Sequence, residues 1–274
     1  MSTESPPDDE EVQASTGPRK SWHRTVETPD TLRHLTDLGA MVDLRSVAVI
    51  IPALNEEISL PGVLKSLPDG PRVIVVDNGS TDDTQGVAQR AGATVVQEPH
   101  RGYGSAVLAG MSHLSADPPV VVVILDADHA DRPELLPRLV APILNDEADM
   151  VLSDRSRTAA PGAMSIPQAF GNAVATNLMW AVSGHRYRDM GPFRAVRWAS
   201  LTAMQMRDPT WGWNVEMQLK AVHLGIRIQE IAVPYGARRG GVSKISGTAK
   251  GVVKAGARIL WAVGRYGPRP TSLK

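Results

Sequence analysis

The chain has 274 residues, and 29 Lys and Arg residues balance 29 Asp and Glu residues, so its formal net charge is zero. This length suits one large α/β domain or two small ones. The lack of cysteine excludes a disulfide scaffold, a cysteine-containing zinc site and a cysteine nucleophile. No apolar run reaches the ~18 residues of a membrane-spanning helix, and the polar residues 1–20 do not resemble a secretory signal. We therefore expect a cytoplasmic protein.

Charge is unevenly distributed along the chain. Residues 231–274 contain nine basic residues and no acidic residue, so the preceding residues carry a net charge of −9. Residues 1–45 contain nine acidic and five basic residues. Such an asymmetry indicates partners better than the total charge does. The basic segment fits either a solvated tail or a phosphate-binding region.

The predicted elements begin after a polar tail, residues 1–45, which we expect to be largely disordered or weakly helical. Apolar strands then alternate with helices, as in βαβ units with a mostly parallel sheet covered on both faces. The predicted strands and extended segments are 47–54, 72–77, 93–97, 120–125, 149–153, 190–197 and 226–233. The predicted helices are 55–67, 80–91, 103–114, a helix from 133, 168–182, 214–224 and 246–263.

Polar residues follow several of these strands, and ligands of such sheets bind at the carboxyl ends of the strands. Asp126 and Asp128 directly follow an apolar run. Two carboxylates at this spacing can hold Mg²⁺ or Mn²⁺, with water and substrate phosphates completing the coordination. The same pair also fits helix-capping residues before Pro133.

Eight segments, in order, resemble the family 2 glycosyltransferases with a GT-A fold, and most of all their polyprenyl-phosphate (dolichol-phosphate) hexosyltransferase branch. The segments are 51–57 (IPALNEE), 75–84 (VVDNGSTDDT), 102–106 (GYGSA), 126–128 (DAD), 153–155 (SDR), 189–194 (DMGPFR), 213–216 (WNVE) and 238–244 (RRGGVSK). The resemblance covers residues 46–250. It implies a single Rossmann-like GT-A catalytic domain at 46–245, followed by a basic amphipathic helix and tail at 246–274.

The resemblance implies roles for the first four segments. Pro52, Glu56 and Asp77 would line the base and ribose of a UDP- or GDP-sugar. Asp126 would contact ribose or a metal-bound water, and Asp128 would bind the cation directly.

Gly102 and Gly104 would allow close backbone approach near the nucleotide, although a helix N-terminus explains them equally well. The branch often carries a glutamine where this chain has Ala130. Water or Asp131 would then complete the cation shell.

The later segments would bind phosphates. Arg155 and Arg194 would hold an acceptor phosphate, which suits the planar guanidinium group. A loop would hold the donor pyrophosphate through Arg238 or Arg239, with Ser243 and Lys244. The segment before Arg194 departs from the usual Ser-Gly-Phe-Arg of the family.

The family inverts configuration at the anomeric carbon, and the acceptor determines whether a base is needed. An ionised phosphate needs none, whereas a hydroxyl needs a carboxylate base. Asp189 and Glu216 are the candidates. Glu216 also fits simple charge complementarity at a helix N-terminus.

The C-terminal helix carries Lys250, Lys254 and Arg258 on one face, together with Trp261. A basic amphipathic helix with Trp is typical of the membrane interface, and its apolar stripe equally fits packing on the catalytic domain. We expect a metal-dependent hexosyltransferase acting on a polyprenyl phosphate at an anionic membrane. The alternatives are a soluble enzyme acting on a small-molecule or saccharide hydroxyl, and an inactive nucleotide-sugar-binding module. The basic segment lacks a series of stacking aromatic residues, so a nucleic-acid partner is not expected.

Overall fold

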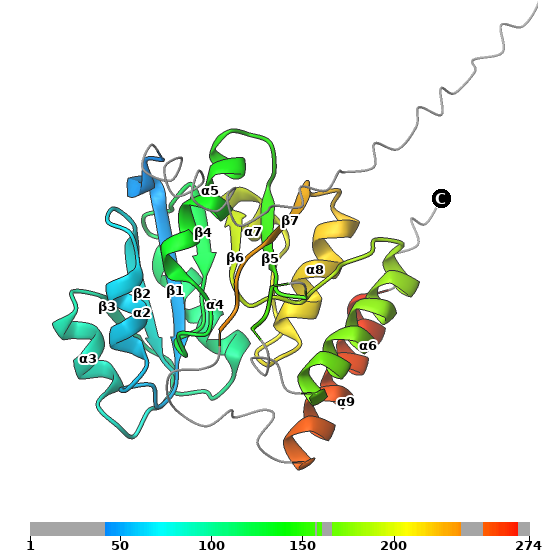
Figure 1. Ribbon diagram of the computed structural model, residues 1–274, viewed down its shortest axis with the longest axis horizontal. Coiled ribbons are helices and arrows are strands. Elements are labelled where there is room, and N and C mark those ends of the chain that lie inside the picture. Colours follow the sequence, from blue (N-terminus) through cyan, green and yellow to red (C-terminus); the bar gives the residue numbers. More distant parts are fainter. Residues whose placement is uncertain (1–41, 157, 161–165, 237–248, 268–274) are drawn as a thin grey trace, which may run out of the picture.

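The computed structural model describes residues 42–156, 158–160, 166–236 and 249–267. Within these ranges, one sheet has seven strands in the order β3-β2-β1-β4-β6-β5-β7 (Figure 1). The strands are β1 (Val47–Ala53), β2 (Arg72–Asp77), β3 (Thr94–Gln97), β4 (Val121–Ile124), β5 (Met150–Asp154), β6 (Arg194–Arg197) and β7 (Ile228–Ala232). Every neighbouring pair is parallel except the two that involve β6.

The central strands are apolar on both faces because helices cover the sheet on both sides. Val47, Val49 and Ile51 of β1 pack toward one core, whereas Ala48 and Ile50 pack toward the other. All five side chains are fully buried. Runs of Val and Ile are typical of parallel strands buried on both faces.

The helices divide between these two cores. Helices α2 (Leu60–Ser66), α3 (Thr84–Arg90) and α5 (Leu136–Leu144) contribute to one core, and α4 (Tyr103–Leu114), α7 (Trp198–Ala203) and α8 (Trp213–His223) to the other. Short 3-10 turns occupy Leu44–Ser46 and Pro133–Leu135.

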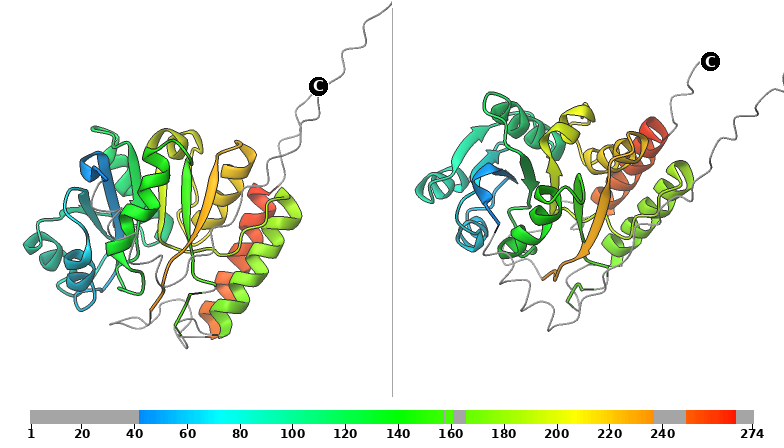
Figure 2. Two further views of the ribbon diagram at one scale, coloured as in Figure 1. Left: turned by 45° about the horizontal axis from the view of Figure 1, so that its top comes forward. Right: turned by 90° about the horizontal axis from the view of Figure 1, so that it is seen from above.

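Helices α6 (Ile166–Ser183) and α9 (Ala249–Tyr266) lie side by side at one end of the sheet (Figures 1 and 2). Helix α9 also packs on α8, and it buries Ala262 and Val263. Leu260 and Trp261, however, are exposed. The packing interpretation of this helix is therefore correct for part of its surface. Among the described residues, no helix is both long and apolar enough to span a bilayer.

The predicted elements agree with the structure apart from their ends. Two helices begin later than expected, at Leu60 rather than residue 55 and at Thr84 rather than residue 80. The sequence pattern did not predict α7. The predicted tail falls largely outside the described residues.

The strand β6 enters the sheet in the opposite direction to its neighbours. Its first residue, Arg194, therefore lies at the edge where β4 and β5 end. This reversal brings the segment before β6 to the same edge as the carboxyl ends of the parallel strands.

Asp149, just before β5, joins three strands through its carboxylate. It accepts hydrogen bonds from Arg227 Nε (2.8 Å) and Arg197 Nε (3.1 Å), which flank β7 and β6. The hydrogen bonds from Arg227 lower the pKa of Asp149 to about 2.

Because this folded-state pKa lies below the ordinary value, Asp149 stabilises the fold above about pH 4 and loses that effect as pH falls toward 2. We expect Asp149→Asn to lower the free energy of unfolding by roughly 2 kcal/mol at pH 7. The difference from the wild type should shrink below pH 4. Urea titrations at several pH values measure it. Asp117→Asn, which removes an exposed pair with Arg72, is the control and should change little. A pH-independent difference for Asp149→Asn would contradict the argument.

Candidate functional site

The loops after β1 and β2 are bonded to each other. Asn55 N–H donates to Ser80 Oγ (2.9 Å), and Thr81 N–H donates to Asn55 Oδ1 (2.7 Å). Glu56 N–H donates to Thr84 Oγ1 (2.8 Å). These side chains bond across the two loops instead of starting the helices predicted there. These hydrogen bonds fix both loops at the carboxyl ends of the strands.

Two predicted nucleotide-binding carboxylates lie at this edge. Glu56 is buried and accepts a hydrogen bond from Ser59 Oγ (2.5 Å). Asp77 ends β2, is also buried, and accepts from Gln85 Nε2 (2.8 Å). Pro52 lies one register position from Asp77 on the paired strand β1. The fold therefore brings together the three residues predicted to line a base and ribose, and that role stays a prediction.

Residues 208–209 pack so closely on Gly102 and Gly104 that neither position has room for a side chain. A Cβ atom on Gly102 would lie 2.1 Å from the carbonyl oxygen of Pro209, and one on Gly104 would lie 1.9 Å from that of Asp208. Both glycines therefore allow close approach of residues 208–209. Their contact with a nucleotide stays a prediction.

Asp126 and Asp128 follow β4, and a third carboxylate lies close by. Asp128 is buried and accepts a hydrogen bond from Ala130 N–H (3.0 Å). Asp131 is 2% exposed, and neither of its carboxylate oxygens has a hydrogen-bond partner within the described part of the chain. Burial, followed by the charges of Asp126 and Asp128, raises the pKa of Asp131 well above its ordinary value, although Arg155 opposes this.

This acidic cluster suits a divalent cation, because a buried carboxylate without a partner needs a proton or a positive charge nearby. Among the described residues, no three histidine, cysteine or acidic side chains are arranged to hold a metal ion by themselves. Mg²⁺ usually binds one or two carboxylates and takes its other ligands from water and substrate phosphates, so a role of Asp126 and Asp128 in cation binding stays a prediction.

His129 has a left-handed backbone conformation, with φ of 58°. Its ring packs against Gly62, and Nε2 lies 3.3 Å from Ser66 Oγ on α2. The imidazole therefore faces helix α2, as a histidine with a packing role does.

Arg155 and Asp189 form a buried ion pair at the same edge. Arg155 Nε and Nη2 donate to the two oxygens of Asp189 at 2.7 and 3.0 Å, and Arg155 N–H donates at 2.8 Å. Burial alone would lower the pKa of Arg155, but the hydrogen bonds to Asp189 outweigh it and raise that pKa. The guanidinium also lies over the ring of Tyr235. Arg155 is therefore permanently charged and fixed in orientation.

Arg194, by contrast, is fully buried and bonded to the backbone. Its guanidinium donates to the carbonyl oxygens of Gly191 and Pro192 and contacts Met217 Sδ. To contact an acceptor phosphate, the guanidinium of Arg194 would have to break these contacts. This geometry favours a structural role for Arg194.

Glu216 is also fully buried, and it anchors a loop. Its carboxylate accepts from the N–H groups of Arg207 (3.0 Å) and Asp208 (2.7 Å) and from Lys220 Nζ (2.6 Å). With these partners it is a poor candidate for a general base. Asp189, bonded to Arg155 and to Met190 N–H, is equally occupied.

Sequence reasoning missed two residues that organise this edge. Asn78 Oδ1 accepts from Gly102 N–H (2.7 Å), and its position within the 75–84 motif was the available signal. Asp208 accepts from Thr210 and from Arg258 Nη2 (2.9 Å) of α9. No sequence pattern pointed to Asp208. The predicted pyrophosphate-binding residues Arg238, Arg239, Ser243 and Lys244 lie outside the described residues.

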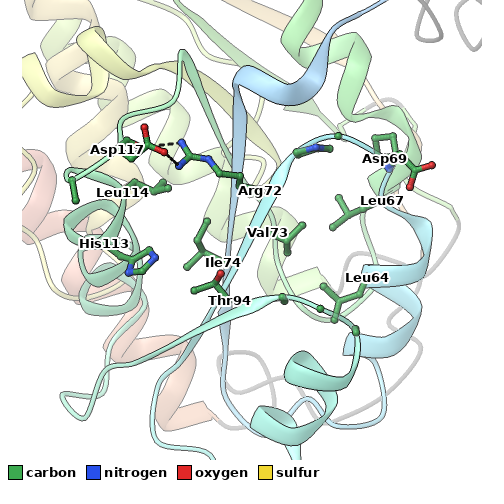
Figure 3. Close-up of a pocket in the computed structure, with 17 residues that line it drawn as sticks. Leu64, Leu67, Asp69, Arg72, Val73, Ile74, Thr94, His113, Leu114 and Asp117 are labelled. Carbon is green, nitrogen blue, oxygen red and sulfur yellow. Dashed lines mark hydrogen bonds and ion pairs between the residues drawn. The ribbon is translucent and has the colours of Figure 1, made fainter.

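An open cavity of about 590 Å³ lies at the opposite edge of the sheet (Figure 3). Arg72 at the start of β2 is among its lining residues and is paired with Asp117 (2.6 Å). Since β2 ends at Asp77, this cavity is remote from the acidic cluster and does not belong to the candidate site.

The family described as glycosyl transferase family 2 matches residues 48–163. An uncharacterized glycosyltransferase of Mycobacterium tuberculosis (strain ATCC 25618 / H37Rv) is 42% identical over 214 residues, which cover 77% of this chain and 94% of the relative. The chain belongs to glycosyltransferase family 2. An undecaprenyl-phosphate mannosyltransferase of Micrococcus luteus is 32% identical over 73% of this chain and 88% of its own length. The predicted resemblance to the polyprenyl-phosphate branch is thus confirmed.

Solved structures show the same fold. Glucosyl-3-phosphoglycerate synthase from Mycobacterium tuberculosis, in complex with Mn²⁺, UDP-glucose and phosphoglyceric acid, matches with a TM-score of 0.66 and 25% identity. The match covers 92% of this chain and 88% of that one. The predicted GT-A fold is confirmed.

The contact between Gly104 and residues 208–209 leads to a stability prediction. We expect Gly104→Ala to lower the free energy of unfolding by roughly 1–3 kcal/mol, because the added methyl group forces backbone apart. Gly171→Ala on α6, where a Cβ meets open space, should be neutral or stabilising. Urea unfolding curves compare the two. Equal effects would show that the close approach does not constrain position 104.

Glu230 on β7 holds the segment before β6. Its carboxylate accepts from the N–H groups of Arg188 (2.9 Å) and Asp189 (3.3 Å). Burial raises its pKa to about 7. Since this acid has a raised pKa in the folded state, its ionisation makes the fold less stable as pH rises from about 4.5 to about 7.

We therefore expect the melting temperature of Glu230→Gln to rise relative to that of the wild type between pH 5 and pH 8. Thermal unfolding followed by circular dichroism at both pH values tests this. Glu134→Gln, which removes an exposed pair with Arg132, should show no such trend. A difference that is the same at both pH values would refute the role of Glu230 ionisation.

Proposed function

We propose that this protein is an inverting, metal-dependent hexosyltransferase that moves a hexose from a UDP- or GDP-sugar to a polyprenyl-phosphate acceptor. The nucleotide would lie against Pro52, Glu56 and Asp77. Asp126 and Asp128 would hold Mg²⁺ or Mn²⁺. When bound, the cation supplies positive charge to the departing diphosphate.

The hydrogen bonding of the two predicted bases is the observation that favours one class of acceptor. Asp189 and Glu216 are both fully buried and both saturated with donors. A hydroxyl acceptor needs a base to remove its proton, whereas a phosphate is already ionised at neutral pH. The bonding of these two carboxylates therefore supports a phosphate acceptor.

A phosphate acceptor needs a nearby positive charge instead of a base, and Arg155 would supply that charge. Two anionic substrates repel each other, and a fixed cation between them lowers that repulsion in the transition state. Because Asp189 binds one edge of the guanidinium and Tyr235 covers its face, Arg155 keeps one orientation without reorganising. It would orient the acceptor oxygen for in-line attack.

Exposed aromatic residues support a peripheral position at an anionic membrane. Phe170 and Trp180 of α6 are 70% and 48% exposed, and Trp261 of the adjacent α9 is 46% exposed. Arg258 lies over the ring of Trp261 at 3.9 Å. Aromatic side chains next to cationic ones are typical of helices at the lipid interface.

A soluble enzyme remains the second candidate, because the solved relative was crystallised with UDP-glucose and phosphoglyceric acid. Sedimentation with anionic vesicles, combined with transfer assays on a polyprenyl phosphate and on water-soluble acceptors, distinguishes the two. Vesicle binding with transfer to the lipid phosphate is expected. Transfer to a soluble alcohol without vesicle binding would overturn the proposal.

The cation site has its own test. A panel of UDP- and GDP-sugars with Mg²⁺ or Mn²⁺ should raise the melting temperature of the wild type. We expect Asp128→Asn to lose the metal-dependent part of this increase. Asp69→Asn, at the opposite edge of the sheet (Figure 3), is the matched control and should keep it. Full metal-dependent stabilisation in Asp128→Asn would show that the site is assigned wrongly.

A further inference from the structure

A second cavity, of about 790 Å³, lies between α6 and residues 186–188. Its lining includes two arginines and no acidic residue, whereas the cavity of Figure 3 is lined by Arg72 together with Asp69 and Asp117. Its polar lining consists of Ser156, Asn172, Thr176, Asn177, Arg186 and Arg188. Such a lining is suited to an anion.

This cavity adjoins the Arg155–Asp189 ion pair. Ser156 follows Arg155 in the chain, and Arg188 precedes Asp189. Asn172 Oδ1 accepts a hydrogen bond from Met190 N–H (2.9 Å), which ties α6 to the same segment. The chain neighbours of both ion-pair residues therefore line the cavity, and a hydrogen bond holds α6 to the segment that follows Asp189.

The two arginines keep donors for a ligand. Arg188 Nη1 lies 3.7 Å from Asp154 Oδ2, which is an ion-pair distance but too long for a hydrogen bond. Arg186 lies over the ring of Trp180 at 5.3 Å, and such a contact engages the face of the guanidinium rather than its N–H edge. Neither guanidinium donates a hydrogen bond to another residue in the described ranges.

Arg155 and Arg194 were the two arginines predicted from the sequence to bind the acceptor phosphate. Because Arg194 is buried and bonded to the backbone, only Arg155 of these two is available. A second guanidinium is available from the adjoining cavity. We propose that Arg186 and Arg188 bind the phosphate of the acceptor beside Arg155, as it enters between α6 and residues 186–188. This inference rests on the proposed function and names the residues that select its acceptor.

The surface of α6 indicates that this phosphate carries an apolar chain. Ala169 and Ala173 line the cavity, and the next residue along α6 from each of them is a large, exposed apolar one, Phe170 and Val174. Residues four apart share a helix face, so Phe170 and Val174 form an apolar strip next to the cavity. An isoprenoid chain leaving the cavity would cover this strip, whereas a small phosphate would leave it exposed.

Titration of the whole chain with farnesyl phosphate, without donor, tests the inference by calorimetry. We expect Arg188→Gln and Arg186→Gln each to weaken binding about tenfold, as expected for the loss of a charge-assisted contact. Arg188→Lys, which keeps the charge, should retain part of the affinity. Arg90→Gln, which removes an exposed arginine of α3, is the matched control and should bind as the wild type does.

Farnesol has the isoprenoid chain without the phosphate, and inorganic phosphate has the charge without the chain. Both should bind more weakly than farnesyl phosphate. Equal binding of inorganic and farnesyl phosphate would overturn the lipid assignment. Unchanged farnesyl phosphate binding in both glutamine variants would overturn the site. Nucleotide-sugar stabilisation that depends on Asp128 should survive in these variants. A protein that shows arginine-dependent binding but transfers no sugar would refute the proposed function, and the cavity would then be a lipid-phosphate-binding site without an acceptor role.

Discussion

The ion pair between Arg155 and Asp189 is the interaction on which the proposed acceptor side of this site depends. It joins the end of β5 to the segment that enters β6, where the chain runs opposite to its neighbours. Asp189 is fully buried, so the loss of either partner would leave an unpaired charge in the interior, at a cost of about 3–5 kcal/mol. The same pair fixes a permanent cation close enough to Asp131 to oppose the rise in the pKa of that carboxyl. Fold stability and the proposed acceptor binding therefore both depend on an intact Arg155–Asp189 ion pair.

The proposed donor side depends on a different network, centred on one loop. Glu216 binds the N–H groups of residues 207 and 208, and the carbonyl of Asp208 packs on Gly104. The carboxylate of Asp208 binds Arg258 of α9. The loop thus connects the helix that carries exposed Trp261 to the glycine segment at the donor edge. A shift of α9 would act directly on Asp208, and Gly104 has no free space in which to absorb a movement of that backbone.

The sequence predicted the sheet because runs such as Val47–Ile51 are compatible with few other structures, and the acidic edge because short motifs follow each strand. It could not predict that Arg194 and Glu216 would be occupied, because most of their partners are backbone groups. The carbonyls of residues 191–192 and the N–H groups of residues 207–208 carry no side-chain signature. The start of α2 was misplaced for a related reason, since Asn55 bonds to Ser80 of a loop 25 residues away. Local patterns identify which groups can bond, whereas the fold selects their partners.

The order of the strands arranges the proposed reaction along one edge. The predicted nucleotide contacts lie on β2 and β1, the acidic cluster follows β4, and Arg155 lies at the end of β5, beyond β6. The acidic cluster therefore lies on the side proposed for the base, ribose and cation, and Arg155 with its partner Asp189 lies on the side proposed for the acceptor. The net charge of zero describes the whole chain and does not show this local separation. In the proposed reaction, separation by sign would let one site hold a cation and two phosphate-bearing substrates, since each anion would meet a positive group before the other anion. An even distribution of the same charges would neutralise them locally and leave the repulsion between the substrates unopposed.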